Sequence, residues 1–147
     1  MSDPKLSLTL DFLNPGDFFT GLEDELKEIG REATTEATAL ILNRIRTRFL
    51  AQEAPDGVAW EPSYAAFLRS FTGRGGGTGF DTGNMFHSIQ QFSISPLEQS
   101  IATDVAYAKY FQEGTEFMPA REFLGFNEED EDLAIRVLLA KLNEAYP

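Results

Sequence analysis

A long run of apolar residues spaced three and four positions apart constrains the fold more than any other feature of the sequence. It covers residues 17–52, and its apolar positions are Leu22, Leu26, Ile29, Ala33, Ala37, Leu40, Ile41, Ile45 and Phe49. This spacing places one apolar stripe along an α-helix. Acidic residues gather near its start and Arg44, Arg46 and Arg48 near its end, as the helix dipole favours. We expect one long helix that packs on the core and leaves a solvated charged face, with a partner-binding face as the alternative.

Two further segments have the alternating pattern of β-strands. Residues 6–13 carry apolar side chains at every second position up to Phe12, and an Asn-Pro-Gly turn signal follows them. We expect a half-buried strand there, at the edge of a sheet or added to it. Residues 88–95 and 100–107 have similar strand character and are joined by Pro-Leu-Glu-Gln. This arrangement predicts a β-hairpin over residues 88–107.

Turn signals and helix caps divide the chain between these elements. Residues 54–60 contain Pro-Asp-Gly, which predicts a turn, and Trp60 is expected to anchor that loop against the long helix. A short helix is expected over residues 62–71. A helical turn should follow near residue 84, with Asp81 or Thr82 as its cap.

The end of the chain completes the predicted fold. Asn127 is a favourable N-cap, and the acidic residues after it suit the first turn of a helix. The expected fold class is α+β, with a small antiparallel β-sheet packed against a long N-terminal helix and a C-terminal helix. Residues 1–147 fit a single domain, with a flexible glycine-rich loop at residues 72–79.

The charge balance excludes several functions. The 147 residues include 24 acidic and 12 basic side chains, a formal charge of −12. Such a surface repels phosphate backbones, so we expect DNA to pass it without adhering.

No run approaches the roughly 20 apolar residues that span a bilayer, and residues 1–15 lack a signal-peptide pattern. We therefore expect no membrane contact and a soluble protein of the cytoplasm.

No constellation in the sequence indicates catalysis or a cofactor. Cysteine is absent and His87 is the single histidine, so a zinc site would need carboxylates almost alone. The glycine-rich loop lacks the lysine of a phosphate-binding loop. His87 and Ser88 would point to opposite faces of a strand, which suits no nucleophile and base. We expect no enzyme, no cofactor and no metal.

Residues 117–126 are apolar apart from Arg121 and Glu122, yet too irregular for a strand or a helix. Such a segment must bury its apolar side chains. It packs either against the core of its own chain or against another subunit.

The order of the motifs resembles the tailed-bacteriophage virion morphogenesis or tail completion proteins. That group contains the Mu G-like and P2 S-like proteins and is related to the HK97-type tail-completion proteins. The motifs are Arg46, Arg48 and Phe49; Pro55-Asp56-Gly57 with Trp60 and Pro62; Asp81-Thr82-Gly83-Asn84-Met85 with Ser88-Ile89; Tyr107-Ala108 with Gln112 and Gly114; and Pro119-Ala120-Arg121 before Phe123-Leu124-Gly125. The resemblance covers residues 20–142. The glycine-rich loop departs from the pattern, and residues 1–19 have no counterpart.

The resemblance implies a structural subunit of the virion neck or tail, assembled in the host cytoplasm. It would form a ring, expected to be hexameric, through which DNA passes without sequence-specific binding. Its partners would be copies of itself and other neck and tail proteins, such as an adaptor, a stopper or the tail tube. The resemblance leaves a tail terminator, a head-tail connector and a non-virion assembly factor open.

A ring built from identical subunits needs two different contact surfaces on each copy. The candidate interface residues are Phe117, Met118, Phe123 and Phe126 as apolar anchors, Arg121 paired with a carboxylate of its own or the adjacent chain, and Arg74. The acidic surplus, with residues 128–132 as an example, would face the channel or solvent. The alternative to a virion subunit is an acidic assembly factor or DNA-mimic inhibitor that binds a basic partner.

Overall fold

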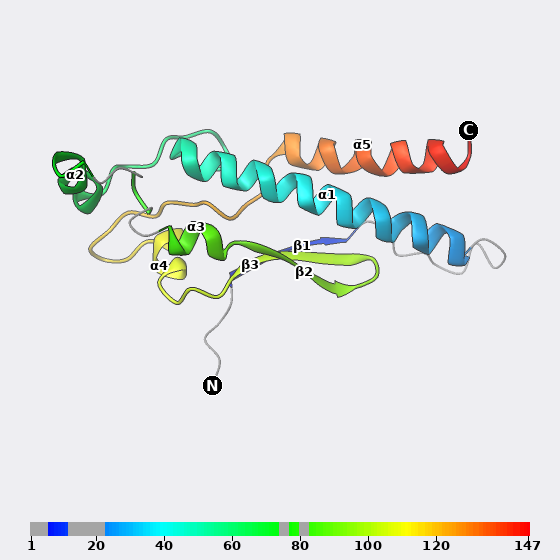
Figure 1. The fold of residues 1–147 in the computed structure, drawn as a ribbon, viewed down its shortest axis with the longest axis horizontal. Helices are drawn as coiled ribbons and strands as arrows, with labels where there is room; N and C mark the ends of the chain where they lie inside the picture. Colours follow the sequence, from blue (N-terminus) through cyan, green and yellow to red (C-terminus); the bar gives the residue numbers. More distant parts are fainter. Residues whose placement is uncertain (1–5, 12–22, 74–76, 80–82) are drawn as a thin grey trace.

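The computed structural model describes residues 6–11, 23–73, 77–79 and 83–147. The central element is α1 (Glu23–Ala51), which lies between α5 (Glu128–Ala145) and the β-sheet (Figure 1). Six of the nine predicted stripe positions are buried: Ile29, Ala33, Ala37, Ile41, Ile45 and Phe49. Leu40 was predicted in the stripe but is 40% exposed, Leu26 is partly buried, and Leu22 lies outside the described residues. The predicted long helix is therefore confirmed from Glu23 onward, and residues 17–22 lie outside the described part.

The helices α1 and α5 run antiparallel. Near the start of α5, Glu129 pairs with Arg44, and near its end Lys141 pairs with Glu36 at 3.1 Å. The N-terminus of α5 therefore packs beside the C-terminal half of α1. This orientation confirms the predicted C-terminal helix and brings its acidic first turn onto the arginines of α1.

The sheet has three antiparallel strands in the order β1-β3-β2: β1 (Leu6–Asp11), β2 (Gln90–Ser95) and β3 (Glu98–Thr103). The predicted hairpin and the predicted edge strand are confirmed. The hairpin is shorter than residues 88–107. Its turn contains two residues, and β3 ends at Thr103, whose hydroxyl accepts a hydrogen bond from the Val105 backbone N–H. Residues 108–113 continue as a helix because Ala108 and Phe111 pack into the core.

Three short helices connect the main elements: α2 (Tyr64–Phe71), α3 (Asn84–Ser88) and α4 (Ala108–Glu113). The predicted helix at residues 62–71 is confirmed, but Ser63 caps it. The predicted cap of α3 is wrong: the N-cap residue is Gly83, with a φ of 78° that glycine favours. Ser88, which the sequence predicts in the strand, instead ends α3, where its hydroxyl donates to the Met85 carbonyl oxygen at 2.6 Å.

The core is built around the ring of Phe49 near the end of α1. Four aromatic rings surround it, with centroid distances of 5.2 to 6.1 Å: Trp60, Phe86, Phe111 and Phe123. The Trp60 indole N–H also donates to the Glu122 carbonyl oxygen at 2.8 Å. Trp60 therefore holds its loop against α1, as the sequence predicts. Along the described residues, no helix is both long and apolar enough to cross a membrane.

Candidate assembly surface

The helix α2 exposes its apolar side chains and buries none of its residues. Tyr64 and Phe71 are 74% and 73% exposed, and Phe67 is 55% exposed. Their rings form a row, with centroids 6.3 Å apart from Tyr64 to Phe67 and 4.9 Å apart from Phe67 to Phe71. Figure 1 shows α2 at one end of the molecule, apart from the α1, α5 and sheet layers. We call residues 63–71 the α2 arm.

Polar contacts hold the α2 arm in place. The Ser63 hydroxyl caps the helix by accepting from the Ala66 backbone N–H at 3.1 Å, and the Ser63 N–H donates to the Thr78 hydroxyl at 3.0 Å. Gln52 in turn fixes the Thr78 backbone through hydrogen bonds of 2.6 and 3.1 Å. The arm is thus anchored by hydrogen bonds between backbone groups and the side chains of Ser63, Thr78 and Gln52, and its aromatic row contributes nothing to the core. A helix this short is stable in water only when something else supports it.

The predicted interface residues of segment 117–126 are divided between the surface and the core. Phe117 is 91% exposed, at a turn closed by hydrogen bonds between the backbones of Thr115 and Met118. Phe123 is 1% exposed and packs in the core. Met118 and Phe126 are partly buried against that core. Of the four apolar anchors, Phe117 offers the largest free surface, and a contact with a second copy stays a prediction for all of them.

Side chains from α1, α4 and the loop at Trp60 satisfy backbone groups of this irregular segment. The Gln112 side-chain oxygen accepts from the N–H groups of Phe123 and Leu124, both at 3.0 Å, and its NH₂ group donates to the Leu124 carbonyl oxygen at 2.8 Å. Trp60 and Arg48 donate to other carbonyl oxygens of the segment. A segment without helix or strand can be buried here because its polar backbone groups have partners.

Arg121 is 5% exposed, and its partners lie within its own chain. Its Nε donates to the Glu61 carbonyl oxygen at 2.6 Å, and its guanidinium lies 5.8 Å from the centroid of the Phe111 ring. The predicted pairing was with a carboxylate, whereas this contact is with a backbone oxygen. Arg121 shares the lining of a cavity of about 670 Å³ with three other predicted residues. These are Gly83, Tyr107 and Met118.

The remaining predicted residues have local roles or lie outside the described chain. Gly114 ends α4 with a φ of 77°, and a Cβ there would lie 2.7 Å from the Ala120 backbone nitrogen. Pro119 is exposed. Arg74 and Asp81 belong to the residues that the structure does not describe.

A buried network of charges joins α1 to the start of α5, and the sequence reasoning missed it. Asp130 is fully buried, and Arg48 contacts both of its carboxylate oxygens, at 3.1 and 3.0 Å. Arg44 also pairs with Asp130 and reaches Glu129 at 2.9 Å. The predicted solvated roles of Arg48 and Asp130 are therefore wrong. Arg44 and Arg48 are four residues apart on one helix face, which was the available signal.

Hydrogen bonds keep Asp130 ionised despite its burial. Burial alone would raise the pKa of the Asp130 carboxyl. Hydrogen bonds from Arg48, Arg44 and the Asn127 backbone outweigh this effect, so the pKa lies below its ordinary value. Asn127 and Asp130 also form a reciprocal capping box at the start of α5. One carboxylate thus caps α5 and fixes it to α1.

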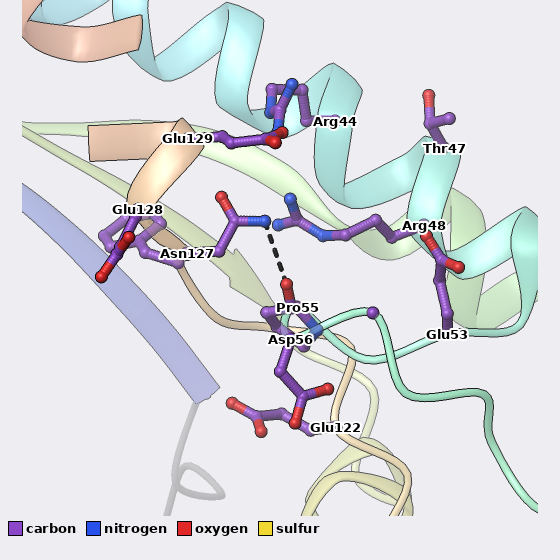
Figure 2. A pocket seen from close by; sticks show the side chains of 12 residues that line it. Arg44, Thr47, Arg48, Glu53, Pro55, Asp56, Glu122, Asn127, Glu128 and Glu129 are labelled. Atoms are coloured by element: carbon purple, nitrogen blue, oxygen red, sulfur yellow. Dashed lines mark hydrogen bonds and ion pairs between the residues drawn. The ribbon is translucent and has the colours of Figure 1, made fainter. Parts of the chain in front are cut away.

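An open groove of about 730 Å³ lies beside this network, between the end of α1, the loop at residues 53–57 and the start of α5 (Figure 2). We call it the acidic groove, because five carboxylates line it: Glu53, Asp56, Glu122, Glu128 and Glu129. Its two arginines, Arg44 and Arg48, already pair with Asp130 and Glu129. Pro55 and Phe126 supply an apolar part of the lining. The Asn127 side chain donates to the Pro55 carbonyl oxygen at 2.9 Å, which joins the two walls.

The described residues contain no group of three or more histidine, cysteine, aspartate or glutamate side chains placed to hold a metal ion. The Ser88 hydroxyl contacts the Met85 carbonyl oxygen and the Thr103 hydroxyl, both at 2.6 Å. These two contacts explain Ser88 as part of the junction between α3 and the sheet.

A model of the phage virion morphogenesis family matches residues 17–143 of the chain. The comparisons with curated proteins and with solved structures gave no significant match.

Proposed function

Since the chain belongs to the phage virion morphogenesis family, we propose that it is a structural subunit of the neck or tail of a tailed phage. In this proposal it completes or terminates the tail, or connects it to the head, as one copy in a ring that DNA passes through. The ring is taken as a hexamer. Its functional surface is a set of contacts between copies, so its action needs neither a cofactor nor a catalytic residue.

The observation that supports self-assembly is the α2 arm. Three aromatic side chains that are more than half exposed lie in one row on a helix with no buried residue. Exposed apolar patches of this kind mark contact surfaces on soluble proteins, and aromatic residues are enriched at the centres of such contacts. Phe117 adds a further exposed aromatic side chain at another turn of the chain.

The distribution of acidic residues supports passage of DNA. Around the start of α5, Glu128, Glu129, Glu131 and Asp132 are exposed, whereas Asp130 is buried by its arginine partners. Together with the formal charge of −12, exposed carboxylates such as those of Glu131 and Asp132 would line a channel that repels a phosphate backbone. A basic channel in the assembled ring would contradict this part of the proposal.

The test measures the mass of the purified chain across a concentration series and its presence in intact particles. We expect a ring-sized oligomer, or a monomer that is found as a ring in particles. Replacing Phe67→Ser together with Phe71→Ser should abolish the oligomer and leave the far-UV circular dichroism unchanged. The matched control is Ile135→Ser with Leu139→Ser, two residues that are also four apart and about half exposed, on α5.

Two results would contradict the proposal. A chain that stays monomeric at every concentration and is absent from particles would instead indicate an assembly factor, or an inhibitor of a basic partner. An oligomer that survives the α2 substitutions but is lost in the α5 control would place the contact surface on α5.

A further inference from the structure

We infer that the α2 arm of one copy docks into the acidic groove of a second copy. This inference rests on the proposed function, because it names the two surfaces that a ring contact would join. It commits to a head-to-tail contact between two different surfaces. Such a contact closes into a ring when successive rotations return to the first copy.

The first argument is charge. Residues 62–79 contain Arg69 and Arg74 and no acidic residue, in a chain with 24 acidic side chains. Two copies that each carry −12 repel each other unless their contact brings opposite charges together. The α2 arm therefore offers a second acidic copy a surface without carboxylates of its own, and its Arg69, which donates to the Gly77 carbonyl oxygen at 2.6 Å, carries a positive charge.

The second argument is the composition of the groove. Within the described part of the chain, no salt bridge holds Glu53, Asp56 or Glu122, since Arg44 and Arg48 are taken by Asp130 and Glu129. Asp56 and Glu122 both line the groove with Pro55 (Figure 2). The groove therefore keeps a negative surplus that a basic segment would neutralise.

The third argument is the match of apolar surfaces. Pro55 and Phe126 line the groove, and Val58, at the end of the same loop, is 62% exposed. The aromatic row of the α2 arm has no apolar partner in its own core. Docking would bury this row on Phe126 and Val58 and would bring the positive charge of Arg69, which stays bound to the Gly77 carbonyl oxygen, near the carboxylates at the rim. An amphipathic helix in a groove is a recurring mode of recognition.

The absence of cysteine allows a direct test by site-specific crosslinking. Ser70→Cys places one thiol on the α2 arm, and Thr47→Cys places one at the groove. Each single variant carries a tag of different size, and the two are mixed with a short bis-maleimide. Because each chain has one thiol, every crosslink joins two chains.

Thr35→Cys is the matched control. Thr35 and Thr47 are both exposed on α1, and each hydroxyl donates to the carbonyl oxygen four residues earlier, at 2.8 and 2.9 Å. They differ in position: Thr47 lines the groove, and Thr35 lies about three helical turns away from Thr47 along α1. We expect the Ser70 and Thr47 pair to crosslink about tenfold more than the Ser70 and Thr35 pair, as a difference in contact free energy of about 1.4 kcal/mol would give.

Charge supplies the second readout. Arg69→Glu should lower the crosslink between positions 70 and 47 several-fold, because it places a like charge against the groove. High salt should lower the same crosslink in the unsubstituted background, since it screens exposed charges. A crosslink that neither Arg69→Glu nor high salt reduces would contradict the role of charge in this docking.

The outcomes separate this inference from the proposed function. A ring-sized oligomer whose thiols crosslink from arm to arm, or equally at positions 35 and 47, overturns the groove as the docking site and leaves the structural ring intact. A chain that stays monomeric and folded, gives no crosslink and is absent from particles contradicts both.

Discussion

Two regions of the molecule depart from the usual rule that charged side chains are exposed and aromatic ones buried. They are the α1–α5 junction and the α2 arm, and they depart from it in opposite ways. At the junction, charged groups are buried: Asp130 is fully buried and Arg48 is 7% exposed. On the arm, aromatic groups are exposed, Tyr64 and Phe71 by more than 70%. The buried charges find their partners inside the chain, whereas the exposed rings find none in its core. The first region is explained by folding alone, and the second is the surface that we propose for a contact between copies.

Burial also divides segment 117–126, which the sequence analysis treats as one unit. Phe117 and Phe123 are six positions apart, and one faces solvent while the other packs against Phe49. The irregular backbone from Glu122 to Gly125 is fixed by Gln112, Arg48 and Trp60. A segment of this kind serves the core and the surface at once.

The largest effect is expected at the buried charge. Asp130→Ala leaves Arg48 buried without its carboxylate and should lower the free energy of unfolding by about 3–5 kcal/mol. Urea unfolding followed by circular dichroism measures it. The control is Glu129→Gln, whose side chain is 79% exposed, and it should cost no more than about 1 kcal/mol. Equal losses in the two variants would contradict a buried network.

Two phenylalanines of one segment give a matched pair for the hydrophobic part of the comparison. Phe123→Ala removes a ring from the core and should cost about 3–5 kcal/mol of unfolding free energy. Phe117→Ala removes a ring that is 91% exposed and should change stability by less than about 0.5 kcal/mol. Thermal and urea unfolding check both values. A large loss for Phe117→Ala in the monomer would show that its ring packs within its own chain.

A smaller effect is expected where a side chain serves the backbone. Gln112→Leu leaves the N–H groups of Phe123 and Leu124 without their acceptor, which should cost about 1–3 kcal/mol. Hydrogen exchange should show faster exchange at these two amides than in the unsubstituted chain. The matched control is Gln90→Leu, an exposed glutamine of β2. If the two variants exchange alike, Gln112 does not support the segment.

The smallest effect is expected from pH. Because the pKa of Asp130 is lowered on folding, the unfolded chain binds its proton more readily, and this carboxyl stabilises the folded state above its ordinary value of 3.8. That contribution is lost as the pH falls through the lowered pKa. Unfolding free energies between pH 2 and pH 6 should therefore decline more steeply in the unsubstituted chain than in Asp130→Asn. Parallel curves would contradict the lowered pKa.

The sequence by itself determined the elements whose signals are local. The steps of three and four residues required the long helix, because only that spacing gives a continuous apolar stripe. The alternating segments required the hairpin and the edge strand, and Asn127 with the acidic residues after it required a helix start. The order of the motifs is also a property of the sequence alone, and it indicates the family.

The tertiary structure alone decided what each side chain faces. In the sequence, Arg48 and Asp130 look like the ordinary charged residues of a helix end and a helix start. The antiparallel packing of α5 on α1 buries them together. Phe117 and Phe123 look equivalent in the sequence. In the structure, Gln112 binds the backbone N–H groups of Phe123 and Leu124, and the Phe123 ring lies in the core while Phe117 is exposed. Burial depends on contacts between residues far apart in the chain, and in these cases the sequence pattern did not fix those contacts. The acidic groove exists for the same reason, since its two walls come from segments about 70 residues apart, Pro55 and Asn127.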